Sequence, residues 1–391
     1  MGSVFIKNGI GMQKKLYRMD GSAPETYQYN INSSNTYFAK TALNNAIAGS
    51  FMRVLTIGDG TDAGVGSDAS GGGGLRSQSW VSQLAPLLST RFSLTVPFQN
   101  VFGGAGKSVT SYGGYNPLLT IGASTLSSSD TGPGGQLWFH NSTSGAFRFT
   151  PTSSFDVATV YWIDNPPARD IQITTDTGVT SPSTLVGNGT GALRVTDVRC
   201  SPNANYIELN SLTGTNIGWL GVETYNSSGS GKILLQNCGW ENSASGDWAG
   251  SSGGAARPIL GVPAMAPHLI FINLNITDMF LETPISIWQS NIQEIINANK
   301  DQSSIVICTS NPLSTTKYGS EGAQAPYFAA IRDLALQNGL PFIDIKTLLG
   351  GTWNAANALG YMSDDQNMLA AGYAAKAAIM DNFFAVMAAV P

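Results

Sequence analysis

Reactive side chains could gather at one turn, in the stretch VLTIGDGTDAG that starts at Val54. Its first four residues are apolar or β-branched and predict a strand buried on both faces, and the glycines that follow permit a sharp turn. Turns of this kind are where α/β enzymes place reactive groups. Gly60 stands at the centre of the turn and has no side chain, so it cannot supply a nucleophile. Thr61 and Ser67 offer hydroxyl groups beside it, and Asp59 offers a carboxylate that could act as a base.

Imidazole and thiol groups are scarce in this sequence. The 391 residues include two histidines, His140 and His268, and three widely spaced cysteines without a CxxC pair, Cys200, Cys238 and Cys308. A zinc site needs several such ligands at close spacing, so we expect no metal site and no cofactor. The cysteines are interpreted as buried free thiols.

Predicted strands and helices alternate on both sides of a long β-rich block. The strand at 54–57 precedes a helix pattern that includes Trp80 and Leu88. After residue 257 the predicted elements are strands at 268–275, 304–310 and 341–345 and helices at 284–298, 324–338 and 369–389. This alternation predicts an α/β domain.

The block between these parts, about 125–236, has a different pattern. Short β-branched and aromatic runs follow one another roughly every ten residues, with turn residues but no helix between them. That pattern is typical of an antiparallel β-sandwich. We therefore expect an α/β domain made of 51–124 and 237–391, interrupted by an inserted sandwich at 125–236.

Composition and charge narrow the range of partners. Only 12% of the residues are charged and the formal net charge is -5, whereas a nucleic-acid-binding protein needs a basic patch. The apolar C-terminal stretches are broken by Lys376, Asp381 and Asn382, so we expect no membrane span. The first residues lack the apolar run of a signal peptide, so export by the usual route is not expected.

The leading segment, residues 1–50, is polar and contains four tyrosines. It has too little apolar surface to build a core of its own. We predict an extended arm that serves attachment or oligomerisation by packing against a partner chain. The alternative is an arm folded back along its own α/β domain.

Four blocks of the sequence, in order, resemble the SGNH (GDSL-type) hydrolase superfamily, whose members are mostly esterases and deacetylases. The blocks are VLTIGDGTDAG, LLQNCGWENSASGDW at 234–248, IFINLNITDM at 270–279 and MSDDQNMLAAGYAAKA at 362–377. Together they cover about residues 50–124 and 236–389. The resemblance implies a flavodoxin-like, three-layer α/β fold.

This chain departs from the family at the positions that carry its catalysis. The family's nucleophilic serine corresponds to Gly60 and its general-base histidine to Asn367, while two oxyanion-hole positions correspond to Asn242 and Thr277. An asparagine does not accept and return a proton at neutral pH, so we expect no catalysis of the family type. The acidic positions are retained as Asp59, Asp278 and Asp364.

These differences favour a non-catalytic protein, a pseudoenzyme that keeps the hydrolase fold as a scaffold. Domains of this kind with a β-sandwich insertion resemble those of bacteriophage tail spikes and fibres. We therefore expect a virion structural or receptor-binding protein, located in the virus particle, that binds host surface polysaccharide. Its partners would be other virion proteins or copies of itself, joined through residues 1–50.

Two alternatives remain open. One is an active carbohydrate esterase or deacetylase with a displaced catalytic set, using Thr61 or Ser67 with Asp59 or Asp365 as the base. Here the simpler interpretation of both hydroxyls is that they satisfy backbone groups in the loop. The other alternative is a cellular carbohydrate-binding module.

Aromatic residues in and beside the inserted block are candidates for glycan binding, because a Trp or Tyr ring can stack on the apolar face of a sugar. The candidates are Trp219, Tyr225, Trp240 and Trp248. Tyr161 and Trp162 are neighbours within one predicted strand, so only one of them is expected to face the sandwich core.

Overall fold

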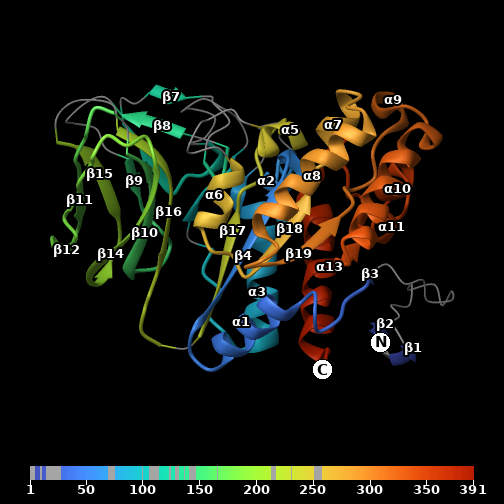
Figure 1. The fold of residues 1–391 in the computed structure, drawn as a ribbon, viewed down its shortest axis with the longest axis horizontal. Coiled ribbons are helices and arrows are strands. Elements are labelled where there is room, and N and C mark those ends of the chain that lie inside the picture. Colours follow the sequence, from blue (N-terminus) through green and yellow to red (C-terminus); the bar gives the residue numbers. More distant parts are fainter. Residues whose placement is uncertain are drawn as a thin grey trace.

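The computed structural model describes residues 5–8, 11–14, 28–68, 75–98, 100–104, 114–122, 125–127, 132–135, 137–140, 147–164, 166–212, 217–229, 231–250 and 258–391. An α/β part and a pair of antiparallel sheets lie side by side (Figure 1). None of the helices in these ranges is long and apolar enough to cross a membrane.

A six-stranded sheet forms the centre of the α/β part. Its strands, in spatial order, are β17 (Lys232–Asn237), β4 (Phe51–Gly58), β18 (Leu269–Asn273), β19 (Ser304–Cys308), β20 (Phe342–Ile343) and β3 (Gln28–Tyr29). The first five are parallel, and β3 pairs antiparallel with β20. Because β17 and β18 follow β4 in the chain but lie on opposite sides of it, the strand order reverses at β4.

Helices cover both faces of this sheet, as expected for parallel strands. One face packs on α1 (Tyr37–Ile47), α3 (Trp80–Phe92) and α13 (Ala370–Ala389), and the other on α5 (Ser245–Ala249), α6 (Pro258–Ala264), α8 (Ile285–Asn299) and α10 (Glu321–Gln337). Val54 and Leu55 of β4 lie in different apolar clusters because successive side chains point to opposite faces. The shorter helices are α2 (Gly60–Ala63), α7 (Ile276–Phe280), α9 (Thr315–Tyr318), α11 (Ile345–Leu348), α12 (Trp353–Ala358) and the 3-10 turn Arg76–Gln78.

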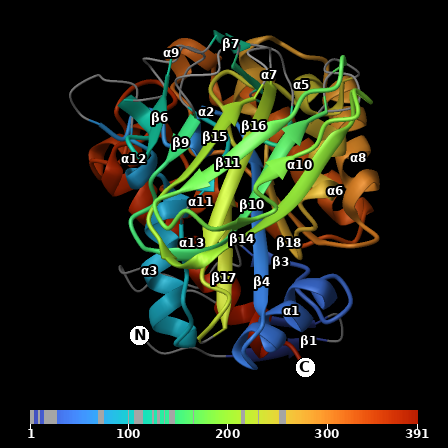
Figure 2. The same cartoon turned by 90° about the vertical axis from the view of Figure 1, so that its left-hand side faces the viewer.

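The antiparallel strands form two sheets that share one apolar cluster. The larger sheet contains β12 (Thr180–Ser181), β14 (Leu193–Ala204), β10 (Phe155–Ile163), β16 (Ile217–Tyr225), β8 (Leu137–His140) and β7 (Thr125–Ser127), with β5 (Asn100–Val101) paired to β16. The smaller one contains β13 (Thr184–Leu185), β11 (Ile171–Thr175), β15 (Ile207–Ser211), β9 (Phe147–Phe149) and β6 (Leu119–Ile121). Figure 2 shows these strands in front of β4 and β17.

The observed strand pairing differs from the prediction at both ends of the β-rich block. β5 and β6 lie before residue 125 and belong to the antiparallel sheets. Residues 232–236, expected in the block, instead belong to β17, which pairs in parallel with β4. The antiparallel strands therefore run from about residue 100 to 225, and the return into the α/β part precedes β17.

The larger antiparallel sheet is buried on both faces where it meets the α/β part. Trp162 belongs to the cluster shared by the two antiparallel sheets, whereas Tyr161 packs with the α/β residues on the other side. Only Trp162 therefore faces the sandwich core, as predicted, and Tyr161 on the opposite face is buried against the α/β part. A buried ion pair, Arg53 Nη2 to Glu223 Oε1 at 2.5 Å, joins β4 to β16 across this junction.

The leading segment differs from an extended arm wherever the structure describes its side chains. α1 buries Ala39, Ala42, Leu43 and Ala46 in the α/β core, and β3 extends the central sheet. The apolar residues of α1 lie on one face of an amphipathic helix, which supplies the burial that we expected to be lacking. Residues 28–47 therefore fold back on their own domain. Before them, β1 (Phe5–Asn8) and β2 (Gly11–Lys14) form a hairpin, and attachment through that part stays a prediction.

Substitutions in α1 test whether this helix is part of the core. Leu43→Ala removes a side chain that is 1% exposed, so the free energy of unfolding should fall by about 3–5 kcal/mol. Ile47→Ala, in the same helix but 56% exposed, is the matched control and should change it by less than about 0.5 kcal/mol. Both values come from urea denaturation followed by tryptophan fluorescence. Equal small effects would show that α1 is dispensable to the fold.

Candidate active site

The carboxyl ends of β17, β4 and β18 converge where the strand order reverses, which is where open α/β sheets form their ligand crevice. β4 ends at Gly58, and the turn into α2 follows it directly. The loop after β17 brings Asn242, and α7 after β18 brings Thr277. The geometry thus gathers residues from three separate blocks of the sequence at one edge of the sheet.

The turn after β4 is held by its own aspartate. Asp59 is the N-cap of α2, and its Oδ1 accepts hydrogen bonds from the Thr61 backbone N–H at 2.9 Å and from the Thr61 hydroxyl at 2.8 Å. Its Oδ2 is buried and has no hydrogen-bond partner among the described residues. Asp59 and Thr61 are thus a carboxylate and a hydroxyl within proton-transfer distance.

A second aspartate, Asp62, joins α2 to the helices α13 and α3. Asp62 Oδ1 accepts hydrogen bonds from Lys376 Nζ at 2.8 Å and from the Trp80 indole N–H, and the side chains of Asp62 and Lys376 are fully buried. The side chain of Asp62 lies against Gly58, where an added Cβ would be 1.6 Å from Asp62 Oδ2. The glycine before the reactive turn is therefore required by the close approach of this carboxylate.

A small cavity of about 10 Å³ opens among these residues. That volume is close to the space that a single water molecule needs. The cavity is lined by Asp59, Gly60, Thr61, Val65, Glu241, Asn242, Ile276, Thr277, Gln366 and Asn367. The structure thus brings together four family positions that the sequence separates by up to 307 residues, from Gly60 to Asn367.

Burial gives Asp59 an unusual acidity. Burial is the largest contribution and the charge of Asp62 adds to it, and together they raise the pKa of Asp59 to about 7 despite hydrogen bonds from Thr61 that lower it. A group with this pKa can accept and return a proton near neutral pH. Perturbed carboxylates of this kind are common at catalytic sites.

The acid of the last block orients the residue at the histidine position. Asp364 Oδ2 accepts a hydrogen bond from the Asn367 side-chain amide at 2.8 Å, and its Oδ1 accepts one from the Asn367 backbone N–H at 2.7 Å. Burial raises the pKa of Asp364, but the hydrogen bonds from Asn367 outweigh it and the pKa lies below its usual value. The buried Asn367 Oδ1 has no hydrogen-bond partner among the described residues. The amide can therefore hold a ligand by hydrogen bonding, although it cannot shuttle a proton.

The remaining family positions differ in role. Asn242 has a backbone φ of 61°, a left-handed conformation that glycine adopts readily and asparagine tolerates better than most residues. Asp278 does not line the cavity, because its carboxylate accepts hydrogen bonds from the Ser245 backbone and hydroxyl, both at 2.8 Å, and so holds the start of α5.

Three of the four aromatic candidates are core residues. Trp219 is fully buried in the cluster between the antiparallel sheets, and Trp240 and Trp248 stack on each other with ring centroids 4.4 Å apart beneath the cleft. They cannot stack on a sugar, so their assignment as glycan-binding residues is wrong. Tyr225 is half-buried and lines a different, larger cavity.

Of the other hydroxyl and carboxylate candidates, only the pair at the turn reaches the cavity. Ser67 Oγ accepts a hydrogen bond from the Leu75 backbone N–H at 2.9 Å and supports the loop. Asp365 does not line the cavity. Glu241 and Gln366 also line the cavity and were not predicted from the sequence. Only their positions next to Asn242 and Asn367 in the sequence could have indicated them.

Comparisons with known proteins support the fold. No protein-family model matches the sequence, and no curated protein matches it either. The solved structure of a peptidoglycan O-acetylesterase matches 93% of this chain and 99% of its own, with a TM-score of 0.69 and 15% sequence identity. This likeness is one of fold, and it supports the predicted α/β architecture with additional antiparallel strands.

Two further solved structures share less of this arrangement. A two-domain esterase active on acetylated mannans, crystallised with mannopentaose, matches 92% of this chain and 55% of its own at 10% identity and a TM-score of 0.41. A family two carbohydrate esterase from Cellvibrio japonicus matches 69% and 96%, at 10% identity and a TM-score of 0.31. Scores this low add no support to an argument about this chain.

The expectation of a non-catalytic protein is corrected by these findings. A protein whose structure matches 93% of this chain is by name an enzyme, a peptidoglycan O-acetylesterase. In this chain the cleft retains a carboxylate of pKa about 7 beside a hydroxyl, Asp59 and Thr61. The replacements at Gly60 and Asn367 therefore do not leave the cleft without proton-transferring groups.

The raised pKa of Asp59 predicts a specific pH dependence of stability. The unfolded chain releases this proton near pH 4 and the folded chain near pH 7, so the contribution is fully present below about pH 4 and is lost as the pH rises to about 7. Asp59→Asn cannot titrate and should escape that loss. Its urea midpoint relative to the wild type should therefore be higher at pH 7.5 than at pH 5. The exposed Asp333→Asn is the control, and parallel pH curves for Asp59→Asn and the wild type would contradict the assignment.

Proposed function

We propose that this chain is an esterase that removes acyl groups from a polysaccharide, using a catalytic set displaced by one residue from the family's serine. The observation that supports this best is the Asp59–Thr61 pair, with 2.8 Å between carboxylate and hydroxyl, at the edge of the cavity. A nucleophile and a base within hydrogen-bond reach are the minimum for covalent acyl transfer.

The proposed reaction has two balanced steps. The Thr61 Oγ attacks the acyl carbonyl while Asp59 accepts the hydroxyl proton, and this proton then passes to the sugar oxygen as the ester bond breaks. Water next attacks the acyl-threonine with Asp59 again as base, which releases the carboxylic acid and restores the hydroxyl. Among the side-chain donors that line the cavity, we assign the Thr277 hydroxyl and the Asn242 amide to stabilising the developing oxyanion.

Substrate entry requires a local opening. A cavity of about 10 Å³ is smaller than an acetyl group, and Thr61 is 1% exposed. Asn242 is exposed on the loop after β17 and forms one wall of the cavity. Outward movement of this loop would admit the acyl group while leaving the Asp59–Thr61 pair in place.

The substrate class is inferred from the likeness to the peptidoglycan O-acetylesterase structure. The matched enzyme is by name an esterase of O-acetyl groups on peptidoglycan. We infer an O-acetylated polysaccharide as the substrate of this chain, with the antiparallel strands acting as an inserted β-sandwich beside the catalytic part. The location in a virus particle and binding to a host receptor stay predictions of the sequence.

Acetyl release tests the proposal directly. The purified chain should release acetate from an O-acetylated polysaccharide and turn over p-nitrophenyl acetate, with a rate that rises with pH through about 7 as Asp59 loses its proton. Thr61→Ala and Asp59→Asn should each lower kcat/KM at least about a hundredfold, whereas Thr61→Ser should retain activity.

Ser67→Ala is the matched control, because this hydroxyl is nearby but does not line the cavity. Mass spectrometry after rapid acid quenching should find an acetyl group on the peptide that contains Thr61. The proposal is wrong if the wild type does no better than the heat-denatured chain, or if Thr61→Ala retains full activity.

A further inference from the structure

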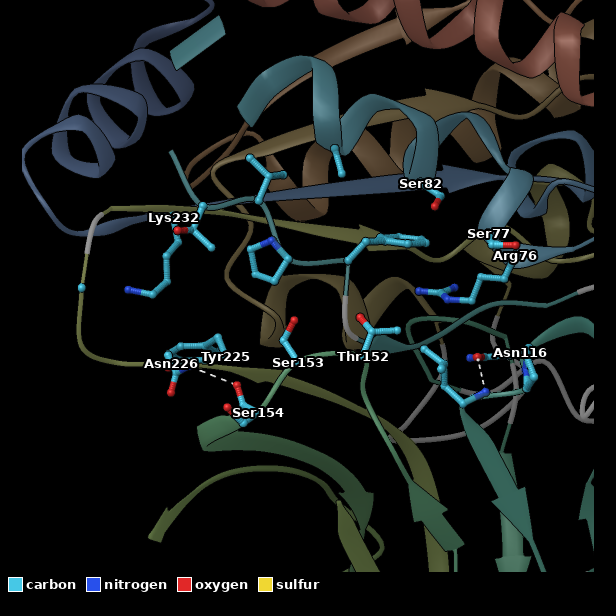
Figure 3. A pocket seen from close by; sticks show the side chains of 18 of the residues that line it. Arg76, Ser77, Ser82, Asn116, Thr152, Ser153, Ser154, Tyr225, Asn226 and Lys232 are labelled. Carbon is cyan, nitrogen blue, oxygen red and sulfur yellow. Dashed lines mark hydrogen bonds between the residues drawn. The ribbon is translucent and has the colours of Figure 1, made fainter. Parts of the chain in front are cut away.

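A second, much larger cavity lies at the opposite end of the central sheet from the cleft. It has a volume of about 640 Å³, and Lys232 in its wall is the first residue of β17, whereas Asn237 at the cleft end is the last. Figure 3 shows two cations in this wall, Arg76 and Lys232. The Arg76 guanidinium donates hydrogen bonds to the Phe102 carbonyl and the Asn100 side chain, and Lys232 has an interaction partner as well. Both charges are therefore engaged within the protein and do not select a ligand.

In the cleft, by contrast, Gln366 has one group left for a ligand. Its side-chain Oε1 accepts hydrogen bonds from Lys317 Nζ, at 2.9 Å, and from the Tyr318 hydroxyl, both on α9. A lysine ammonium donates hydrogen bonds and accepts none, so the amide oxygen must face Lys317 and the amide Nε2 must lie on the other side. Gln366 lines the cleft cavity, and its Nε2 makes no hydrogen bond to the residues that the structure describes.

The backbone of Gln366 is held at both ends. Its N–H donates to Asp364 Oδ1 at 2.8 Å, and its carbonyl accepts a hydrogen bond from Asn311 Nδ2 at 2.7 Å. Asn311 is fully buried, so this second contact joins Gln366 to the core. The amide is thus fixed through its backbone and through α9 before a substrate arrives. A donor fixed in this way stabilises a developing charge without reorganisation.

The hydroxyl of Tyr318 also places the Gln366 amide near the reactive turn. Burial is the largest cause of the raised pKa of the Tyr318 hydroxyl, and the negative charge of Asp59 comes next. Because a charge acts more weakly with distance, this hydroxyl lies near Asp59. Gln366 and Thr61 line the same cavity of about 10 Å³. An oxygen atom that fills so small a space is close to every residue in its wall, including Gln366.

Gln366 differs from Asn242 in what holds it. Asn242 is exposed on the loop after β17, and this loop has to move outward to admit an acyl group. The contacts of Gln366 are made with α9, Asn311 and Asp364, and none of these belongs to that loop. The Gln366 amide can therefore stay in place while the cleft opens.

We propose that the Gln366 side-chain amide binds the acyl carbonyl oxygen of the substrate, with Tyr318 and Lys317 as the residues that position it. Nε2 donates to this oxygen, and the hydrogen bond strengthens as Thr61 attacks and negative charge develops there. This role rests on the proposed hydrolysis and adds to it a donor that no opening of the cleft displaces.

Kinetics with p-nitrophenyl acetate measure this role. Gln366→Met removes the donor without adding charge, and it should lower kcat at least about a hundredfold while KM changes less than about threefold, because the lost hydrogen bond is strongest in the transition state. Gln302→Met is the same substitution at an exposed glutamine just before β19, and as the matched control it should leave kcat unchanged. Should Gln366→Met not fold, Gln366→Glu keeps the size and the acceptor for Lys317 and should lower kcat as strongly.

A double-mutant cycle tests whether Tyr318 acts through Gln366. Tyr318→Phe leaves the amide oxygen with Lys317 alone and should lower kcat about three- to tenfold. In the Gln366→Met background the same change should have no further effect, because the group that Tyr318 positions is gone. Equal effects of Tyr318→Phe in both backgrounds would show that it does not position Gln366.

Acetate, the product of the proposed reaction, reports on Nε2 without turnover. In a chain labelled with nitrogen-15 glutamine, the side-chain amide signals that Gln366→Met removes identify Gln366. Sodium acetate should shift these signals saturably, whereas the signals of Gln302 should not move and sodium chloride should shift neither. Asn116→Ala alters the wall of the larger cavity and should leave the acetate shift unchanged.

The outcomes separate this role from the proposed function. If Thr61→Ala is inactive but a folded Gln366→Met hydrolyses at the wild-type rate, the role of Gln366 is wrong and the proposed function stands. If the wild type hydrolyses no ester, the proposed function is wrong. In that case a saturable acetate shift at Gln366 still supports acyl binding by its amide, and an unmoved signal overturns it.

Discussion

Asp62 is a buried carboxylate, and the structure around the cleft depends on the groups that neutralise its charge. Lys376 from α13 and Trp80 from α3 both donate to Asp62 Oδ1, so two helices far apart in the sequence are fixed under the turn that follows β4. Removing one partner of such a buried pair costs about 3–5 kcal/mol because the other charge stays buried. Asn237 at the end of β17 donates to the Asp62 backbone carbonyl at 2.7 Å and joins the neighbouring strand to the same point.

The same buried charge sets the chemistry of the cleft. Asp59 stands three residues before Asp62, and the negative charge of Asp62 adds to burial in keeping the pKa of Asp59 near neutrality. In the proposed reaction Asp59 is therefore the base, while Asp364 orients Asn367. The turn thus holds a proton-accepting group although position 60 is a glycine and position 367 is an asparagine, because the acidity of Asp59 depends on its burial and on the charge of Asp62.

Local patterns in the sequence were enough to predict the parallel strands β4, β18, β19 and β20 and the helices that follow them, but not the parallel pairing of β17. Their apolar periodicity survives in the structure because each of these elements buries a single defined face. Burial that depends on contact between segments far apart in the sequence cannot be predicted from a local apolar pattern. Trp240 and Trp248 were candidates for glycan binding, yet they are buried in the cluster that the α/β part shares with residues of the antiparallel sheets. The burial of α1 was not predicted for the same reason, since its partner strands in the central sheet begin after it in the chain.

β17 shows why the limits of the β-rich block matter for function. Its first residue, Lys232, lines the large cavity, its Gln236 donates to Glu223 of the antiparallel sheet, and its last residue, Asn237, supports the turn at the cleft. Glu223 in turn pairs with Arg53 of β4. A unit cut from the chain at residue 236 would take most of this strand with it and leave Arg53 buried without its counter-charge. The antiparallel sheets are therefore not an independent domain. β17 and the Arg53–Glu223 ion pair connect them to the α/β part in the region between the two cavities.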